Sequence, residues 1–534
     1  MRRIKIITAL ILAIFTLFVS MGWLTFRRSA DFFPTHNPVR DIEFISARHH
    51  SVEHPAERAV VRGYLYDRLK SLGGQPEICR YDSIANVYCK FEPSGADTSS
   101  AYLLLVAHLD SRFPEQTPQG EVCSYGAADD GYGLAVILEL VDKALDYSGE
   151  WRQGLKVLFT DSEERNLDGV RTALEMDNSQ FDNVGLVVNV EARGVRGPAL
   201  LFESSADNDR LMDFYVKHAG MPYTYSLTSA VYGMMPNYTD FTYLKPLFPG
   251  YNFSVIDNLH YYHNDKDNFS NISPAAIAHY GVQLEPMLKA FLTSEQFSDP
   301  DYFIGEEDNV VFTLPGLGTI NLSRTGNYLL NAAALVLFVL VLLLYTASGR
   351  VRLAEVFANA VKTLVYALLA ALVSTGIVYL ASRLAGVPFS FFSLKYLRGD
   401  WLLASGILFV TAALYVGLFA KRVRRSEDFV FGHLLGLSLT VVIISAVLLL
   451  TVGENLFLLL PLFCILTGLL LHIFVHMNIV SLPAFLLVEL AGAPFLYNLY
   501  TALTVGSLGI IVFLAYIYIA MIASLMRLFM YQRI

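Results

Sequence analysis

The sequence predicts an α/β domain, a mixed central β-sheet flanked by helices, joined to a C-terminal multi-span α-helical membrane domain. Hydrophobic residues make up 54% of the 534 residues and the mean hydropathy is +0.45, too apolar for an ordinary soluble protein. Nearly all Asp, Glu, His and Pro lie within residues 27–326, whereas residues 327–534 form apolar runs of about 20 residues broken by short polar loops. In the polar part, short apolar runs alternate with helical patterns. We therefore expect a signal anchor over 1–26, an exported domain over 27–326 and a membrane domain over 327–534.

The N-terminal segment begins with Arg2, Arg3 and Lys5, and an apolar stretch from about Ile6 to Phe26 follows. A cleaved secretory signal is the alternative to an anchor, but the apolar run is long and no clear small-residue cleavage site follows it. Both readings place the next domain outside the cytoplasm.

The exported part shows strand and helix patterns in alternation. The runs at 101–107, 155–160 and 184–190 have the length and β-branched content of strands buried on both faces. Residues 57–72 and 133–147 repeat apolar residues at spacings of three and four, which indicates helices. Such alternation predicts a mixed sheet covered by helices, with ligands bound beyond the carboxyl ends of the strands.

The C-terminal part contains seven candidate membrane spans, near 328–347, 362–382, 401–420, 432–452, 456–476, 482–500 and 503–525. With the N-terminus in the cytoplasm, the cytoplasmic loops and ends carry twelve Lys and Arg residues and the short outward loops carry three. This asymmetry predicts that residues 27–326 lie in the periplasm, a lumen, a vacuole or the extracellular space.

The net charge bears on nucleic-acid binding, and the cysteine positions bear on disulfide formation. The net charge of −9 comes with no basic stripe, so we expect no nucleic-acid partner. Cys79 and Cys89 flank a predicted hairpin that is symmetric about Ile84, and we expect that a cross-strand disulfide could join them in an oxidising compartment.

Acidic residues and histidines follow each predicted strand of the exported part. The first strand runs into "HLDS", the second into "DSEE" and the third into "EARG". The candidate ligands in chain order are His108, Asp110, Asp129, Asp130, Glu163, Glu164, Glu191 and His263. Each of these residues alone is weak evidence for a metal site, since a lone His-x-Asp is more often a surface pair and Glu-Glu is usually a solvated helix end. Together they supply the imidazoles and carboxylates that suit Zn²⁺, and a dication would stabilise adjacent carboxylates.

The series "HLDS", "GAADDGYG", "DSEERNLDG", "NVEARG" and "YHNDKD" resembles the co-catalytic zinc aminopeptidases of peptidase family M28, over about residues 55–295. The stretch "NVEARGVRGPALLFESS", with Glu where Asp is commoner, looks like the membrane-anchored branch that contains the vacuolar membrane protease and the endoplasmic reticulum metallopeptidase. The resemblance implies a zinc exopeptidase domain joined to a multi-span tail.

The resemblance also implies two Zn²⁺ ions per chain and a ligand set. One ion would be held by His108 and Glu191, the other by Glu164 and His263, with Asp129 bridging both. Asp129 is third after Gly126, as in the family's Gly-x-x-Asp spacing, and Asp130 would then not bind metal. His263 is preferred to His260 because it stands in His-x-x-x-Asp, with Asp267 at the matching place.

The expected catalytic residues are Glu163, as general base, and Asp110, as the acceptor that fixes the tautomer of His108. The chain departs from the family pattern at Asn166 and Asn264, where Gly and Thr are commoner, and neither change removes a ligand. The stretch around Asp240 matches the family only loosely, so the residues that set specificity stay unassigned.

The sequence thus predicts a membrane-anchored dinuclear zinc exopeptidase, an aminopeptidase whose partners are peptide substrates and the lipid bilayer. Two alternatives are a glutaminyl-cyclase-like acyltransferase with one zinc and an inactive receptor or scaffold. A transporter with a ligand-binding exported domain is a third. In the tail, Glu489 and His472 lie within predicted spans, where ionisable groups suggest function, but no repeat or acidic ladder accompanies them, so anchoring and packing are favoured.

Overall fold

The chain forms two compact units in the computed structural model, which describes residues 7–8, 11–18, 33–95, 98–117, 120–235, 237–392, 394, 397–423, 426–475 and 481–530. The first, here called the sheet unit, comprises Thr25–Thr313 and Thr319–Ser323. The second, the helical unit, comprises Met1–Leu24, Leu314–Gly318 and Arg324–Ile534. Residues 7–8 and 11–18 are helical, and the rest of the expected signal anchor lies outside the described residues.

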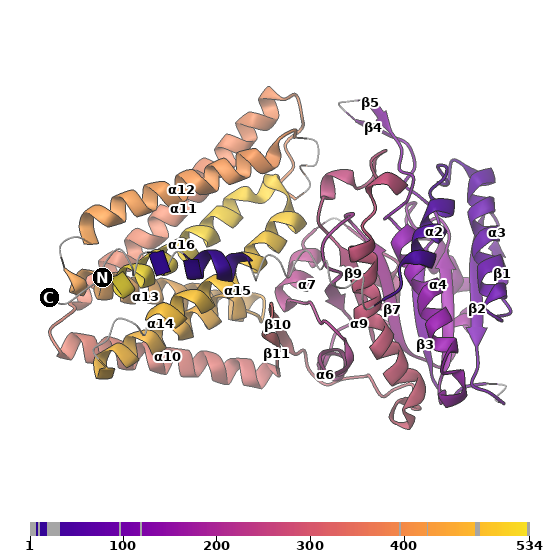
Figure 1. Cartoon of the computed structure of the whole chain (residues 1–534), viewed down its shortest axis with the longest axis horizontal. Helices are drawn as coiled ribbons and strands as arrows, with labels where there is room; N and C mark the ends of the chain where they lie inside the picture. Colours follow the sequence, from indigo (N-terminus) through magenta and orange to yellow (C-terminus); the bar gives the residue numbers. More distant parts are fainter. Residues whose placement is uncertain are drawn as a thin grey trace. The chain divides into compact units, whose positions relative to one another are not determined.

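A seven-stranded mixed sheet forms the centre of the sheet unit (Figure 1), with strand order β1-β2-β6-β3-β7-β9-β8. Its strands are β1 (Glu77–Tyr81), β2 (Ile84–Phe91), β3 (Tyr102–His108), β6 (Gly154–Thr160), β7 (Val184–Ala192), β8 (Leu200–Ser204) and β9 (Gly250–Val255). The four central strands β6, β3, β7 and β9 pair in parallel, and the pairings towards both edges are antiparallel. The predicted mixed sheet is confirmed.

Helices cover both faces of this sheet. They are α2 (His36–Ile45), α3 (Pro55–Ser71), α4 (Gly131–Leu145), α5 (Asp168–Met176), α6 (Asp209–His218), α7 (Ser226–Gly233), α8 (Phe241–Leu244) and α9 (Pro274–Thr293). Helices α2, α3, α4, α6 and α9 contribute to one apolar core, and α5 and α8 to the other. Two short ribbons complete the unit: β4 (Glu115–Thr117) with β5 (Gly120–Val122), and β10 (Val310–Leu314) with β11 (Gly318–Leu322).

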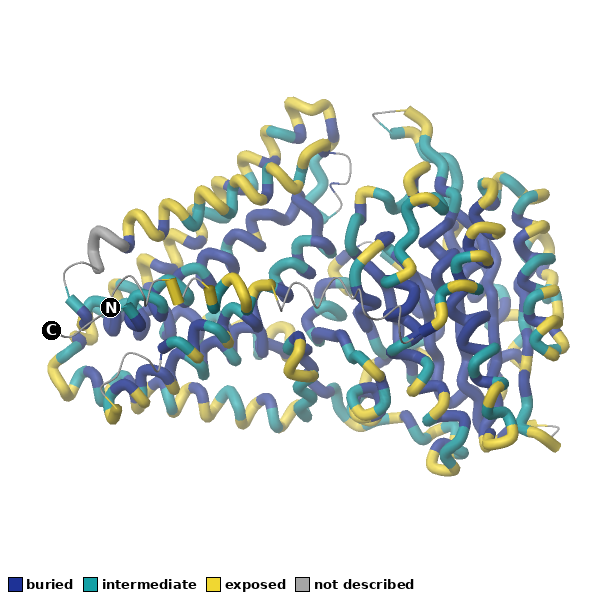
Figure 2. The backbone as a smooth tube through the Cα atoms, in the orientation of Figure 1, coloured by how far each residue is buried: buried dark blue, intermediate teal, exposed yellow. Residues whose placement is uncertain are grey.

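The central strands are buried along their whole length (Figure 2), because helices pack on both faces. Along β3, Leu103 and Leu105 point into the core of α4 and α9, whereas Leu104 and Val106 point into the core of α5. Apolar residues therefore dominate these strands, and the polar residues inside them, Lys156, Asn189 and Asn252, form hydrogen bonds.

The structure contradicts the expected disulfide between Cys79 and Cys89, which are both free. The turn joins Tyr81 to Ile84, so Cys79 pairs with Asn86 and the hairpin is not symmetric about Ile84. Cys89 is buried in the core of α4, whereas Cys79 packs against the core of α5. The two thiols thus lie on opposite faces of the sheet.

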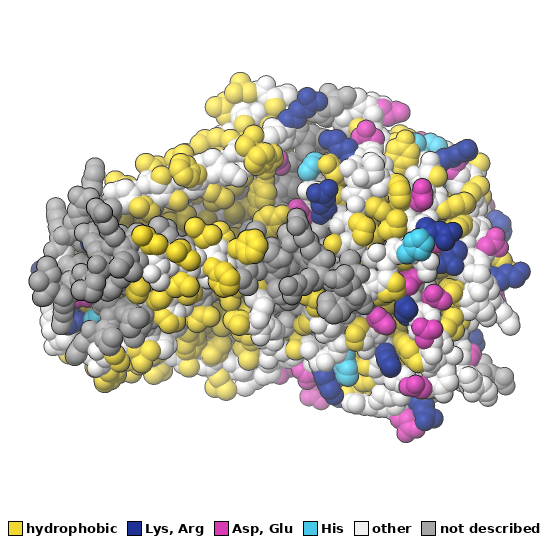
Figure 3. All heavy atoms as spheres, viewed as in Figure 1, with side chains coloured by type: hydrophobic (Ala, Val, Ile, Leu, Met, Phe, Trp, Pro, Cys, Tyr) yellow, Lys and Arg dark blue, Asp and Glu magenta, His cyan; other side chains and the backbone are white. Residues whose placement is uncertain are grey.

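The helical unit contains, among the described residues, seven helices that are long and apolar enough to cross a membrane. They are α10 (Arg324–Ala347), α11 (Leu353–Leu384), α12 (Asp400–Val423), α13 (Glu427–Thr451), α14 (Leu456–Val475), α15 (Ser481–Leu503) and α16 (Leu508–Met530). Hydrophobic side chains dominate the surface of this unit in Figure 3, and charged side chains gather on the sheet unit. The expected multi-span α-helical part is confirmed.

His472 and Glu489 are ionisable residues that the sequence places within predicted spans. His472 of α14 is buried, with its Nε2 atom 3.7 Å from a carboxylate oxygen of Glu427 and its Nδ1 atom 3.4 Å from the Tyr345 hydroxyl. Glu489 lies in the middle of α15. The contacts of His472 join α10, α13 and α14, as its expected packing role requires.

Candidate metal centre

Five segments of the sheet unit bring ligand-type side chains to one edge of the sheet. His108 is the last residue of β3, Glu163 and Glu164 follow β6, and Glu191 lies near the end of β7. Because these strands are parallel, their carboxyl ends meet at the same edge. Asp129 precedes α4, and His263 lies in the loop after β9.

Asp129 lies between two histidines. Its Oδ1 atom is 3.1 Å from Nε2 of His108, and its Oδ2 atom is 3.3 Å from Nε2 of His263. Each imidazole also faces a glutamate: His108 Nε2 lies 3.7 Å from Glu191 Oε2, and His263 Nε2 lies 3.1 Å from Glu164 Oε1. The five side chains thus form two His-Glu pairs that share one aspartate.

Three atoms of this cluster are buried without a hydrogen-bond partner among the described residues. They are Asp129 Oδ2, Glu164 Oε1 and His263 Nε2. These three side chains offer ligand atoms within 4.8 Å of one another, as do His108, Asp130 and Glu191. Buried polar atoms that converge without hydrogen-bond geometry are costly unless a cation lies between them, so the residues fit a metal ion.

Asp130 also lies near the cluster, but backbone groups use both of its carboxylate oxygens. Oδ1 accepts a hydrogen bond from Gly133 N at 3.0 Å and caps α4, and Oδ2 accepts from His108 N at 3.3 Å. The two adjacent aspartates therefore have different contacts. Asp130 links β3 to α4 through backbone hydrogen bonds, and Asp129 faces the two histidines.

Asp110 fixes its neighbours through two different groups. His108 Nδ1 lies 2.8 Å from the backbone carbonyl oxygen of Asp110 and 3.7 Å from its carboxylate, so the carbonyl is the acceptor that orients the imidazole. The carboxylate instead accepts a hydrogen bond from the backbone N–H of Glu163 at 2.9 Å. Asp110 therefore faces His108 through its carbonyl oxygen and holds the backbone of Glu163 through its carboxylate.

Burial, neighbouring charges and hydrogen bonds shift the pKa values of the carboxyl groups in the site. Burial raises the pKa of Glu163 well above its usual value, against the attraction of His108, and repulsion from Glu191 adds to the rise. Burial likewise raises the pKa of Glu191 to about 8. Burial would also raise the pKa of Asp129, but hydrogen bonds and charge from His108 and His263 outweigh it and lower the pKa. A dication would stabilise all three carboxylates in the charged form.

The sequence alone gave Asp267 only a place in the His-x-x-x-Asp spacing. In the structure its buried carboxylate accepts hydrogen bonds from Ala128 N at 2.7 Å, from Asp129 N at 3.3 Å and from the Ser124 hydroxyl at 2.9 Å. It thereby holds the backbone that presents Asp129. The spacing from His263 was the signal that could have assigned this role.

Three arginines that contact acids near the site were not predicted from the sequence. Arg112 lies 3.1 Å from Glu164 Oε2 and also pairs with Glu115 of β4, which ties Glu164 to the β4–β5 ribbon. Asp161, directly after β6, forms buried ion pairs with Arg58 at 3.0 Å and Arg62 at 2.7 Å. Apart from Arg112 and Glu115, the paired residues lie about 50 or 100 positions apart, and no local sequence pattern signals such pairs.

A sequence model of peptidase family M28 matches residues 86–287, which include every residue of the cluster. Residues 86–287 form a peptidase family M28 domain. Mouse endoplasmic reticulum metallopeptidase 1 is 29% identical over 253 residues, which cover 46% of this chain and 27% of the relative. A vacuolar membrane protease of Yarrowia lipolytica is 26% identical over 219 residues, 40% of this chain and 21% of the relative.

The match to these relatives is partial, because the chain spans just over a quarter of the length of the metallopeptidases. Among solved structures, a Zn-dependent exopeptidase from Parabacteroides distasonis is similar, with 17% identity and a TM-score of 0.36 over 49% of this chain and 99% of that one.

Proposed function

We propose that this chain is a membrane-anchored dinuclear zinc exopeptidase, an aminopeptidase that removes N-terminal residues from peptides outside the cytoplasm. The observation that carries the proposal is the geometry of Asp129, whose two carboxylate oxygens face two histidines, each with its own glutamate. A carboxylate between two cations is the arrangement that co-catalytic metal sites need.

The donor set favours zinc and a count of two. Two imidazoles and three carboxylates are ligands typical of Zn²⁺. His108, Glu191 and Oδ1 of Asp129 would hold one ion, and Glu164, His263 and Oδ2 of Asp129 the other. The mammalian relatives are metallopeptidases by name, which agrees with metal-dependent peptide hydrolysis.

When bound, the zinc ions would polarise the scissile carbonyl and make the attacking water more acidic. Glu163 would accept the proton of that water on its carboxylate and deliver it to the departing amine. The hydrogen bond from its backbone N–H to Asp110 fixes the residue beside the cluster.

The acid content of the site supports specificity for a free N-terminus. Asp240 is buried, receives a hydrogen bond from the Thr160 hydroxyl and has an Oδ1 atom with no hydrogen-bond partner among the described residues. Its charge is close enough to Glu163 and Glu191 to raise their pKa values. We infer that Asp240 adds to a negative potential that attracts the α-ammonium group of a peptide.

The spans and the charges support a membrane topology for the chain. Seven apolar helices and the excess of Lys and Arg at the ends assigned to the cytoplasm support a multi-pass protein whose sheet unit lies outside the cytoplasm. Peptides in a lumen, vacuole or periplasm would then be the substrates.

Metal analysis and a substrate panel test the proposal on the purified full chain. We expect two zinc ions per chain and hydrolysis of aminoacyl substrates with a free α-amine, and no hydrolysis of their N-acetylated counterparts. One zinc per chain with cyclisation of an N-terminal Gln peptide would instead identify an acyltransferase. A zinc-free protein that binds peptides without cleaving them would identify a receptor.

A further inference from the structure

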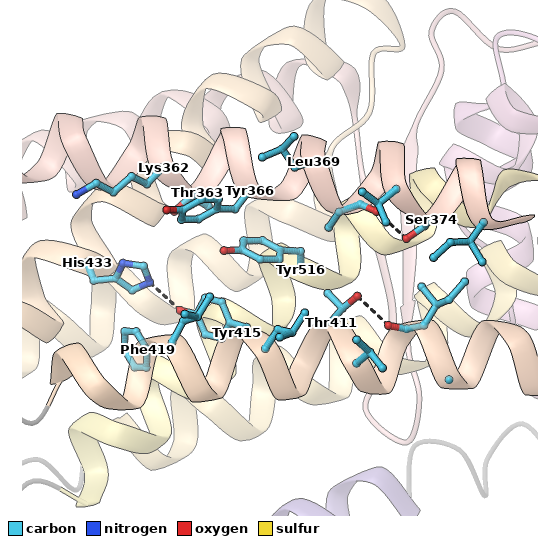
Figure 4. Close-up of a pocket in the computed structure, with 18 of the residues that line it drawn as sticks. Lys362, Thr363, Tyr366, Leu369, Ser374, Thr411, Tyr415, Phe419, His433 and Tyr516 are labelled. Atoms are coloured by element: carbon cyan, nitrogen blue, oxygen red, sulfur yellow. Dashed lines mark hydrogen bonds between the residues drawn. The ribbon is translucent and has the colours of Figure 1, made fainter.

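The helical unit contains a half-open cavity of about 590 Å³ between α11 and α12, whose aliphatic wall residues are exposed and to which α13 and α16 also contribute residues (Figure 4). Its volume falls within the range of roughly 300–1,000 Å³ that is usual for small-molecule sites. All four helices belong to the helical unit, so the cavity is separate from the metal centre. The proposed peptidase chemistry does not use it.

Most of the cavity wall is aliphatic. Leu369, Val373 and Ile377 line it from α11, and Val410 and Leu414 line it from α12. The Ser374 and Thr411 hydroxyls, which also face it, donate to carbonyl oxygens of their own helices at 2.6 and 2.8 Å (Figure 4). The wall therefore offers apolar surface, and the hydroxyl groups of its serine and threonine residues are already satisfied.

The dimensions fit one hydrocarbon chain. From Thr363 to Ile377 the cavity follows α11 over fourteen helical steps, which at a rise of 1.5 Å each is about 21 Å. This exceeds half of the ~30 Å hydrocarbon thickness of a bilayer, the depth that one leaflet supplies.

One end of the cavity is polar and positively charged. Lys362 and Asn359 of α11 lie there with His433 of α13, whose Nε2 atom is 2.7 Å from the Tyr415 hydroxyl. Figure 4 shows Lys362 and His433 at one end and Ser374 towards the other. Among the described residues that line the cavity, Lys362 is the one with a full charge, and none is acidic.

We propose that this cavity binds one anionic phospholipid, with an acyl chain along α11 and α12 and the phosphate at the Lys362 ammonium group. An aliphatic slot with a cation at one end complements an amphiphile whose head is negative. The hydroxyl of Tyr366, which lines the cavity beyond Lys362, can donate a hydrogen bond to an ester oxygen.

Native mass spectrometry of the full chain in detergent tests the proposal. The probes are phosphatidylglycerol and phosphatidylcholine with the same acyl chains. Lys362→Gln removes the charge, and Arg383→Gln, on the same helix outside the cavity, is its control. Gly406→Trp fills the cavity from α12, and Gly417→Trp is its control, since both glycines face open space and Gly406 alone of the two lines the cavity.

We expect one tightly retained phosphatidylglycerol per chain and at least fivefold weaker retention of phosphatidylcholine. Lys362→Gln should weaken phosphatidylglycerol about fivefold, and Gly406→Trp should abolish the retained lipid, with both controls unchanged. Equal retention of the two lipids, retention unaffected by Lys362→Gln, or a free fatty acid or peptide in the cavity would overturn the proposal. If Gly406→Trp does not fold, Val410→Phe, which fills the same wall, takes its place under the same criteria.

Discussion

Replacing Glu163 with Gln tests the proposed general base, because the change removes proton transfer and little else. The side chain keeps its size, and the hydrogen bond that fixes the residue runs from its backbone N–H to Asp110, so it survives the substitution. Loss of a positioned base lowers kcat by typically 10²–10⁴-fold, equal to about 2.7–5.4 kcal/mol in activation free energy. We expect that loss with both zinc ions retained.

Stability should move in the opposite direction from activity. Burial raises the pKa of Glu163 and nearby acids repel it, so its carboxylate is costly to keep charged. In the chelated, zinc-free protein, the melting temperature of Glu163→Gln should therefore equal or exceed that of the parent chain.

The assay combines kcat/KM on an aminoacyl substrate, zinc content and thermal unfolding. Glu164→Gln is the matched control: the same chemical change one residue away removes a ligand atom that faces His263, and we expect it to lower the zinc content. The reasoning fails if Glu163→Gln keeps more than a tenth of the parent activity, or loses its activity together with its metal.

Three further predictions concern metal and pH. Asp267→Ala frees the backbone that presents Asp129, so a chelator titration should show roughly 10–100-fold weaker zinc retention; unchanged retention would deny Asp267 this role. Glu191 has a folded pKa of about 8 in the metal-free protein against 4.5 unfolded, so the folded state binds more protons in this window. Thermal unfolding of the chelated protein should thus show stability falling as pH rises from about 5 to 8, and an opposite trend would contradict the assignment. Buried His279 has a pKa lowered to about 3, so the parent should lose stability below pH 6.5, by at most about 1.4 kcal/mol per pH unit, relative to His279→Gln; parallel pH profiles would refute this.

The position of the predicted hairpin shows a limit of local sequence reasoning. The predicted hairpin between Cys79 and Cys89 is present, but the register depends on which residues form the turn, and here the turn lies between Tyr81 and Ile84. A shift of the turn away from Ile84 moved the partner of Cys79 and placed Cys89 on the other face.

The sequence pattern also did not predict where the helices begin and end. The second span was expected at 362–382, whereas α11 begins at Leu353. Polar residues such as Glu355 and Asn359 interrupt the apolar run without interrupting the helix, since a helix needs no apolar residue at its exposed positions. Asn359 lies in these additional turns and lines the polar end of the cavity.

The sequence by itself determined the broad plan, because apolar runs of membrane length and buried strands that end in acids are local patterns that burial enforces. It also brought His108, Glu163, Glu164 and Glu191 to one place, since parallel strands have their carboxyl ends at the same edge. Only the tertiary structure decided which oxygen of Asp129 faces which histidine, that the Asp110 carboxylate orients Glu163, and that Asp267 holds the Asp129 backbone. Those contacts depend on side-chain directions across segments that fold together from as far as 138 positions apart, and no local pattern encodes such directions.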